Sequence, residues 1–278
     1  MGGTGGIGRN PQAKLVMQKL FIIKIGGNVL DDEKMLQSFL SDFASIQYPK
    51  ILVHGGGKIA TKIGEQLGIE SKYTNGRRIT DEATRDLVSM VYGGLVNKQI
   101  IATLQNQNCN AIGLTGADGN VIAAIKRPKG TIDYGYVGDT ESKNVNTSFL
   151  HFLLKQNTVP VFAPLTHEKG SMLNTNADTI ASVLAIALSK HFTIRLIYCF
   201  EKKGVLKSVN DENSVISMLN AKSYQQLLEN GTLANGILPK LENAFTAIQK
   251  GVNEVLIGSA QDLIKNMGDK TEGTLIRM

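Results

Sequence analysis

A strand-loop-helix pattern that occurs twice near the start of the chain most constrains its fold. The run 20–25 is almost entirely apolar, ends at Gly26-Gly27, and precedes a helical pattern over 31–46. The run 51–53 ends at three glycines and precedes a second helical pattern over 58–67. Short apolar runs are typical of strands buried on both faces. Successive units of this kind predict right-handed crossovers and a parallel sheet.

The rest of the chain extends the same architecture. Further strands are expected at 111–114, 159–163, 194–200 and 254–257, and helices at 81–105, 146–156, 176–190, 221–230 and 237–251. The turn-rich segment 119–140 predicts an antiparallel excursion. We therefore expect an α/β fold, a three-layer α/β/α sandwich around a mainly parallel open sheet. Its parts would be a flexible leader (1–18), an N-terminal lobe (19–175) and a C-terminal lobe (176–278).

Composition argues against several classes of protein. No apolar run approaches the roughly 20 residues that span a bilayer, so no membrane partner is expected. The formal charge is +6, but Arg9, Lys14 and Lys19 fall in a stretch without acids, which leaves +3 for the remainder. Without a Lys/Arg run and with 6% aromatic residues, nucleic-acid binding is not expected either. The two cysteines, Cys109 and Cys199, are too few to stabilise a chain of this size through disulfide bonds, which favours the reducing cytoplasm.

The leader contains a second, competing signal. Residues 3–8 match the GxGxxG pattern of dinucleotide-binding folds, which would indicate an oxidoreductase. That motif needs a preceding strand to anchor its turn, and only Met1 and Gly2 come before it. Glycine-rich flexibility is therefore the favoured interpretation.

The first glycine loop is a candidate anion site. Ligands of open α/β sheets bind at the carboxyl ends of the strands, where Gly26 and Gly27 fall. Glycines allow backbone N–H groups to approach an anion at a positive helix start. Lys24 could be a simple edge charge, but a lysine within an apolar strand needs a reason to lose water.

The second glycine loop, Gly55 to Gly57, leaves bare backbone at the same edge of the sheet and could serve packing or a ligand. We interpret His54 as structural, because nothing in the sequence places a nucleophile or metal partner beside it. Further along, Asn174, Asn176 and Asp178 open the apolar helix. Helix capping explains one such residue, whereas three at alternate positions favour a ligand site.

Two basic positions complete the candidate site. Lys240 follows Gly236-Ile237-Leu238-Pro239 in the first turn of a helix, where a cation opposes the helix dipole and is better explained by an anionic ligand. Arg78, in the segment 75–80 (Asn-Gly-Arg-Arg-Ile-Thr), could bind a carboxylate at two points or remain a solvated loop charge.

Taken together, these segments resemble the amino acid kinase family, and within it the acylglutamate kinase branch. The matching segments are 23–28, 53–57, 75–80, 174–178 and 236–240, in the order of the family and from about Leu20 to the end of the chain. The resemblance implies ATP-dependent phosphorylation of the side-chain carboxylate of an N-acylated glutamate, acetylated or succinylated, as a step of arginine biosynthesis. Other members of the family and a non-catalytic amino-acid or nucleotide sensor are the alternatives.

The resemblance also implies residue roles. Lys24 and Lys240 would stabilise the phosphoryl group in transfer, and Asp178 would orient both lysines. The acylated amino acid would be held by four groups, namely the backbone at Gly56 and Gly57, Arg78, Asn174 and Asn176. ATP would lie near Gly26, Gly27, Glu201, Gly204 and Gly236.

Two departures from the family pattern affect these expectations. Residues 200–204 read Phe-Glu-Lys-Lys-Gly where many relatives have a Thr/Ser-Asp-Val-x-Gly turn, so the resemblance does not define the nucleotide contacts there. The end of the chain is short and the leader lacks an apolar helix, which favours a homodimer over an arginine-regulated hexamer.

The residue types suit this reaction. A glutamate side chain with a pKa near 4.3 is already ionised at neutral pH, so no general base is required. The barrier lies instead in the repulsion between an anionic nucleophile and the phosphates, which positioned cations and backbone donors reduce. Mg²⁺ is expected to arrive with ATP, bound through phosphate oxygens and water, without a metal cage of protein side chains.

Overall fold

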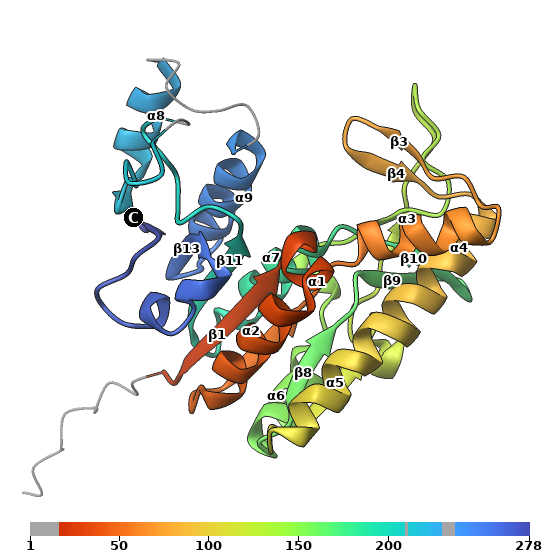
Figure 1. The fold of residues 1–278 in the computed structure, drawn as a ribbon, viewed down its shortest axis with the longest axis horizontal. Coiled ribbons are helices and arrows are strands. Elements are labelled where there is room, and N and C mark those ends of the chain that lie inside the picture. Colours follow the sequence, from red (N-terminus) through yellow and green to blue (C-terminus); the bar gives the residue numbers. More distant parts are fainter. Residues whose placement is uncertain (1–16, 209–210, 230–236) are drawn as a thin grey trace, which may run out of the picture.

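The computed structural model describes residues 17–208, 211–229 and 237–278, and its centre is an eight-stranded sheet (Figure 1). In spatial order its strands are β12 (Met218–Leu219), β14 (Thr274–Ile276), β13 (Glu254–Ser259), β11 (Thr193–Phe200), β1 (Lys19–Ile25), β2 (Lys50–Val53), β8 (Val159–Phe162) and β5 (Ala111–Leu114). All neighbours pair in parallel except β13 and β14. The α/β prediction with a mainly parallel sheet is confirmed, and both glycine loops follow strands near its middle.

Helices cover both faces of the sheet. One layer contains α2 (Glu33–Ser45), α3 (Gly57–Gln66), α4 (Glu82–Val88) and α5 (Asn97–Asn106), and the other contains α6 (Thr147–Lys155), α7 (Ala177–Leu188) and α9 (Leu238–Gln249), with α8 (Ala221–Glu229) at its margin. Residues of β1 alternate between the two layers. Phe21, Ile23 and Ile25 pack with the first layer, whereas Leu20 and Ile22 pack with the second.

The shorter elements lie at the ends of the sheet and in its connections. They are α1 (Gly27–Asp31), the 3₁₀ turns η2 (Asp118–Asn120), η3 (Ser142–Asn144), η4 (Ala260–Asp262) and η5 (Lys265–Met267), and three two-stranded pairs: β3 (Lys72–Thr74) with β4 (Arg77–Ile79), β6 (Ile125–Lys126) with β7 (Gly138–Asp139), and β9 (Leu165–Glu168) with β10 (Ser171–Asn174). The antiparallel pairing of β6 with β7 confirms the excursion expected over 119–140.

Two local expectations are wrong. The segment 164–175, whose polar residues predict a loop before the helix at 176–190, forms the β9–β10 hairpin instead. Its strands are too polar to give an apolar run, and its turn is made by Lys169 and Gly170, both with positive φ. The helix expected over 81–105 is also not regular, because a π-helical stretch, η1 (Ser89–Val96), separates α4 from α5.

The helical stretch from Glu82 to Asn106 is long and apolar enough for a membrane span by length and composition alone. However, 44% of its most apolar part is buried inside the molecule. Leu87, Val91 and Ile100 belong to the core shared with α2 and the sheet. Core packing therefore accounts for much of its apolar character.

Candidate active site

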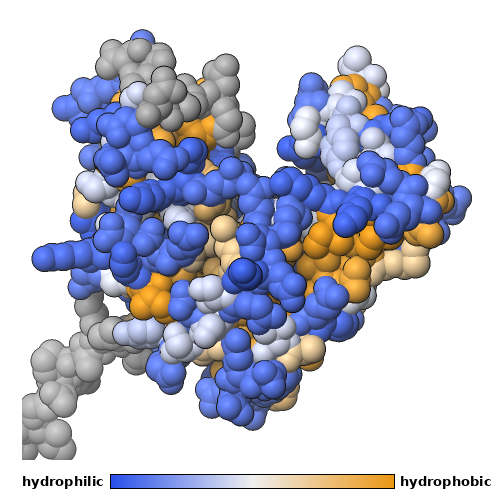
Figure 2. Space-filling model, viewed as in Figure 1, coloured by the Kyte–Doolittle hydropathy of each residue, from blue (hydrophilic) through white to orange (hydrophobic). Residues whose placement is uncertain are grey.

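The candidate site lies where β1, β2 and β11 end. Lys24 is one residue before the end of β1, with Val53 of β2 and Tyr198 of β11 as its neighbours in the parallel ladders. Gly26 and Gly27 follow, and Gly27 begins the short helix α1. The surface is hollowed between the part that contains α8 and α9 and the part that contains β3 and β4 (Figure 2). The carboxyl edge of the sheet thus carries Lys24 and the first glycine loop.

Asp178 contacts both candidate lysines. The Nζ atom of Lys24 lies 2.7 Å from one carboxylate oxygen of Asp178, and the Nζ atom of Lys240 lies 3.8 Å from the other. The Lys24 and Asp178 side chains are 13% and 19% exposed, and Lys240 is 32% exposed. Two ammonium groups from distant parts of the chain therefore converge on one carboxylate.

The protonation state of Asp178 follows from these contacts. Burial by itself would raise the pKa of this carboxyl group, but the charges and hydrogen bonds of Lys24 and Lys240 outweigh that effect and hold the pKa below its usual value. Asp178 is therefore ionised at neutral pH and acts as the common counter-charge of the two lysines.

Arg78 is fixed over the second glycine loop. Arg78 is buried, and its guanidinium group donates to the Gly57 carbonyl at 2.8 Å, to the Thr61 hydroxyl at 2.9 Å and to the Ser71 hydroxyl. Its guanidinium group also stacks on the Tyr73 ring, 4.8 Å from the ring centre. These bonds use three of its five N–H donors and leave two for a ligand.

The second glycine loop can approach a ligand only as bare backbone. Gly56 has a φ of 150°, and an added Cβ would lie 2.8 Å from the ring of Tyr92. Any other residue there would be strained and would collide with η1. Nothing lies within 4 Å of a Cβ added at Gly57, so the backbone of this loop borders open space there.

Asn174 and Asn176 have different surroundings, although the sequence suggested a similar role for both. Asn176 caps α7, with its side-chain oxygen accepting from the backbone N–H groups of Asp178 and Thr179 at 2.8 and 3.2 Å. Asn174 instead donates through Nδ2 to the hydroxyl of Thr80 at 3.0 Å. Capping accounts for the Asn176 oxygen, whereas the oxygen of Asn174 is not used in this way.

Two cavities are lined by residues of the candidate site. One of about 220 Å³ contains the second glycine loop and the asparagines, and is lined among others by Gly56, Arg78, Tyr92, Asn174 and Asn176. The other, of about 200 Å³, is lined by Lys24, Gly26, Gly27, Asn28, Val29, Phe200, Glu201 and Lys240. The lysines therefore border a cavity that is separate from the one that contains Arg78.

The remaining residues expected near the nucleotide have mixed placements. Glu201 lines the cavity that contains the lysines. Gly204 is buried against Thr274 and Val215, where an added Cβ would lie 2.8 Å from each, so packing explains this glycine. Gly236 and the GxGxxG motif lie outside the described residues.

Sequence reasoning missed several lining residues, including Asn28, Tyr73, Tyr92 and Phe200. A signal for Tyr73 was present, because Asn75-Gly76 is a typical hairpin turn and both residues have positive φ. A strand on each side of that turn would place Tyr73 beside Arg78. Tyr92 gave no comparable signal, since it lies within an apolar helical stretch.

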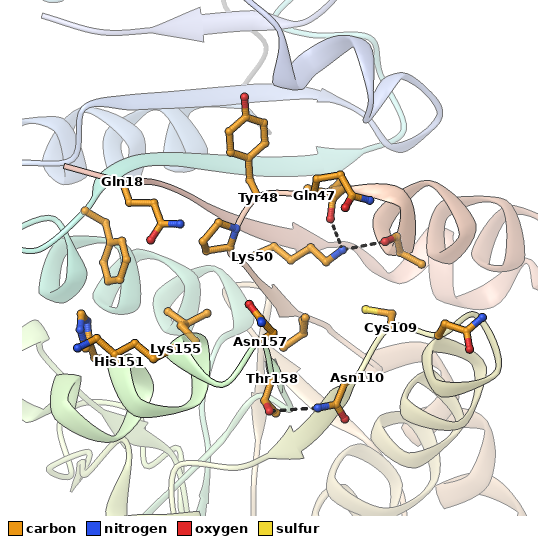
Figure 3. Close-up of a pocket in the computed structure, with 17 residues that line it drawn as sticks. Gln18, Gln47, Tyr48, Lys50, Cys109, Asn110, His151, Lys155, Asn157 and Thr158 are labelled. Carbon is orange, nitrogen blue, oxygen red and sulfur yellow. Dashed lines mark hydrogen bonds between the residues drawn. The ribbon is translucent and has the colours of Figure 1, made fainter. Parts of the chain in front are cut away.

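A third cavity, of about 570 Å³ and thus larger than these two, lies elsewhere, at the amino ends of β2, β5 and β8 (Figure 3). Its buried cation, Lys50, donates to the carbonyls of Phe43, Ala44 and Ile46 at 2.7 to 3.0 Å, at the end of α2. These bonds satisfy the amine within the protein. Size alone therefore does not make this cavity the site of chemistry.

His54, between β2 and the second glycine loop, is fully buried and has a structural role. Its Nδ1 lies 2.6 Å from the Gly55 carbonyl, which can only accept, so Nδ1 carries the proton and Nε2 accepts from Asn97. Burial lowers the pKa of His54 from 6.5 to about 4, and Lys98 adds to the shift. His54 is neutral at pH 7 and holds the start of the glycine loop.

We expect His54 to make the fold sensitive to mild acid. The pKa of His54 is lower in the folded than in the unfolded protein. Its contribution to the free energy of unfolding is therefore fully present above pH 6.5 and is lost progressively as pH falls toward about 4. The loss from this group should be about 2 kcal/mol between pH 7 and pH 5. Urea unfolding of the parent protein and of His54→Gln at both pH values tests this. Equal losses in the two proteins would contradict it.

Comparisons with known proteins find similar sequences over most of the chain. The model of the amino acid kinase family matches residues 19–259. An acetylglutamate kinase from Cytophaga hutchinsonii is 54% identical over 93% of this chain and 98% of its own length. One from Phocaeicola vulgatus is 54% identical over 90% and 97%.

Solved structures share the fold. The crystal structure of smu.665 from Streptococcus mutans superimposes with a TM-score of 0.74 and 30% identity, covering 93% of this chain and 98% of that one. A carbamate kinase from Giardia lamblia bound to AMP-PNP gives a TM-score of 0.67 at 16% identity, over 94% and 98% of the two chains. The second likeness concerns the fold alone.

Proposed function

The chain belongs to the amino acid kinase family, and we propose on that basis that it transfers the γ-phosphoryl group of ATP to the side-chain carboxylate of N-acetyl-L-glutamate. The product is an acyl phosphate, formed as a step of arginine biosynthesis. The observation that carries this proposal is the convergence of Lys24 and Lys240 on Asp178, beside two cavities.

We assign the two substrates to the two cavities. The acylated glutamate would occupy the cavity that contains Arg78 and Asn174, with backbone N–H groups of the second glycine loop around it. The ATP phosphates would occupy the cavity that contains Gly26, Gly27 and the two lysines. This arrangement places the ammonium groups near the phosphoryl group that passes between the substrates. It is also consistent with the predicted boundary at about residue 175, with the amino acid bound by the N-terminal lobe and ATP by the C-terminal lobe. That boundary stays a prediction.

The reaction then needs charge stabilisation more than proton transfer. The attacking carboxylate is ionised at neutral pH, since its ordinary pKa is near 4.3. Both it and the phosphates are anionic, and the transition state spreads charge over the equatorial oxygens of the phosphoryl group. Lys24 and Lys240 reduce this repulsion, and the Asp178 carboxylate holds the two ammonium groups close together.

We propose that Mg²⁺ accompanies ATP, held mainly by phosphate oxygens and water. The carboxylate between the two lysines, Asp178, is paired with both ammonium groups and is a poor metal ligand in that state. Within the described parts of the chain, no cluster of three or more His, Cys, Asp or Glu side chains has the arrangement of a metal site. When bound, the ion would neutralise charge on the phosphates.

An ADP-release assay tests the proposed activity. N-acetyl-L-glutamate with Mg²⁺ and ATP should give turnover, whereas N-acetyl-L-glutamine, which lacks the side-chain carboxylate, should give none. A non-catalytic sensor would bind N-acetyl-L-glutamate without releasing ADP. Removal of residues 1–16 tests the oxidoreductase alternative, because a kinase should keep its activity without the GxGxxG motif.

N-succinyl-L-glutamate remains the alternative acceptor. It has one more carboxylate than the acetyl compound, and Arg77 lines the same cavity as Arg78. Within the described residues Arg77 has no acidic side chain within 4 Å, so its charge could face that group. Values of kcat/KM for the two compounds, measured side by side, decide between them.

We expect Arg78→Lys to weaken binding of the amino acid. Lysine keeps the charge but loses the planar fork that binds a carboxylate and stacks on Tyr73. The KM for the acylglutamate should rise about tenfold or more, with the KM for ATP unchanged. Steady-state kinetics measure both values. Arg277→Lys, at an exposed position near the end of the chain, is the control, and an equal rise in both KM values would contradict the assignment.

We also propose a cytoplasmic homodimer. Met90 and Leu95 of η1 are 57% and 42% exposed, and Figure 2 shows an apolar area on the side where the helices α4 and α5 lie. Such an area is common at subunit interfaces. Sedimentation of the purified protein tests the dimer.

The cytoplasmic location rests on the cysteines. Cys109 and Cys199 are both buried and unpaired, which fits a reducing compartment.

A further inference from the structure

Thr80 links the two side chains assigned to the acylated amino acid. It is fully buried, one residue beyond β4, the strand that carries Arg78. Its Oγ1 lies 3.0 Å from Nδ2 of Asn174 and 3.3 Å from the carbonyl of Arg78. A buried hydroxyl group is costly unless it has hydrogen-bond partners, and these are the partners it has.

The directions of the two bonds follow from the chemistry of the groups. A threonine hydroxyl has one hydrogen, and the Arg78 carbonyl can only accept, so the Thr80 hydroxyl donates to that carbonyl. Its oxygen then accepts from the amide nitrogen of Asn174. The amide of Asn174 is thereby oriented, with the nitrogen toward Thr80 and Oδ1 pointing away from it.

The backbone around Thr80 is itself fixed. The Thr80 N–H donates to the Tyr134 carbonyl at 2.9 Å, and the Tyr136 N–H donates to the Thr80 carbonyl at 2.6 Å. The Tyr136 carbonyl in turn accepts from the Asn174 N–H at 2.9 Å. Gly135 has a φ of 72°, and an added Cβ would overlap the Thr80 carbonyl. The segment 134–136 therefore joins Thr80 to Asn174 along the backbone as well.

Two cations hold that segment in place. The centre of the Tyr136 ring lies 3.8 Å from the Nζ atom of Lys126 and 4.6 Å from the guanidinium carbon of Arg85. These cation–π contacts restrict the ring from moving away from α4. Thr80 thus sits in a rigid frame, which a group must have if it is to orient another side chain.

From these contacts we propose that Thr80 is a positioning residue for the acylated amino acid. Its hydroxyl orients the Asn174 amide toward the substrate cavity and ties that amide to the strand that carries Arg78. The two substrate-binding side chains then act as one preorganised unit, although they come from β4 and β10. This inference rests on the proposed function, because it assumes that the cavity binds the acylated glutamate.

Thr80→Val tests the role of the hydroxyl, because valine keeps the shape of the side chain and removes the hydrogen bonds. We expect the KM for N-acetyl-L-glutamate to rise about tenfold, while kcat and the KM for ATP stay within about twofold of the parent values. Thr80→Ser, which keeps the hydroxyl, should retain the parent KM. If Thr80→Val does not fold, Thr80→Ala removes the same hydroxyl without added bulk.

A double-mutant cycle separates positioning from general destabilisation. Asn174→Ala alone should raise the KM for the amino acid, and adding Thr80→Val should raise it no further. An unchanged KM in Thr80→Val, a Thr80→Ser enzyme as impaired as Thr80→Val, or additive effects in the double variant would each overturn the proposal. Turnover by the parent enzyme tests the proposed function separately, since these outcomes are ratios to parent activity.

Discussion

Replacement of Lys24 with alanine is expected to lower kcat on the order of 10²-fold or more. The Lys24 ammonium group lies 2.7 Å from Asp178, is largely shielded from water, and borders the cavity assigned to the ATP phosphates. A preorganised charge that is shielded from water stabilises the transition state far more than a charge in bulk water. Loss of one such contact commonly lowers kcat by about this factor. The effect should appear in kcat at saturating concentrations of both substrates.

The matched control for Lys24→Ala is Lys265→Ala. Lys265 is also paired with an aspartate, Asp262, at 3.2 Å, but it is 62% exposed and lies in η5, away from both substrate cavities. Its loss should leave kcat unchanged. A folded Lys24→Ala enzyme with a kcat within about threefold of the parent value would remove Lys24 from the proposed mechanism.

Asp178→Asn should cause a loss of similar size for a different reason. The amide keeps the shape of the carboxylate but removes the charge that both ammonium groups share. Lys24 and Lys240 would then repel each other and lose their fixed positions, so kcat should fall on the order of 10²-fold. Because the shielded ammonium group of Lys24 is left without its partner, the free energy of unfolding of the protein without ligand should also fall by about 3 kcal/mol.

ATP provides a second measurement on Asp178→Asn. The phosphates bring negative charge to the same two lysines, so ATP should raise the melting temperature of this variant more than that of the parent protein. Asp262→Asn removes a lysine-paired carboxylate outside the site and should show neither effect. A fully active Asp178→Asn enzyme, or one with a smaller ATP shift than the parent, would contradict the shared counter-charge.

The sequence predicted the layers well because strand burial leaves a strong pattern. Residues 20–25 are apolar on both sides of β1, and both sides contact helices. β9 and β10 were missed because one face of the hairpin is polar, and β14 because three residues give too short a run. The π-helical stretch changes the hydrogen-bond pattern with little change in which residues are apolar, so periodicity could not reveal it.

The charged residues of the site could be read from the sequence, whereas their supporting residues could not. Lys24 and Lys240 stand out because each is electrostatically unfavourable where it lies, which suggests a ligand. Thr80 is unremarkable in its segment, and its importance depends on contacts with 134–136 and Asn174. Those contacts form only when three distant segments of the chain pack together. Local patterns in one sequence do not indicate which distant segments will be in contact.

The alternating pattern of β1 has a consequence for how the length of this strand can vary. Lys24 is in phase with Leu20 and Ile22, on the side of the sheet that packs against α7, the helix whose first turn contains Asp178. Insertion or deletion of one residue within β1 would move the lysine to the opposite face, among the apolar side chains that contact α2. Insertions or deletions in β1 should therefore abolish activity even if the sheet still forms.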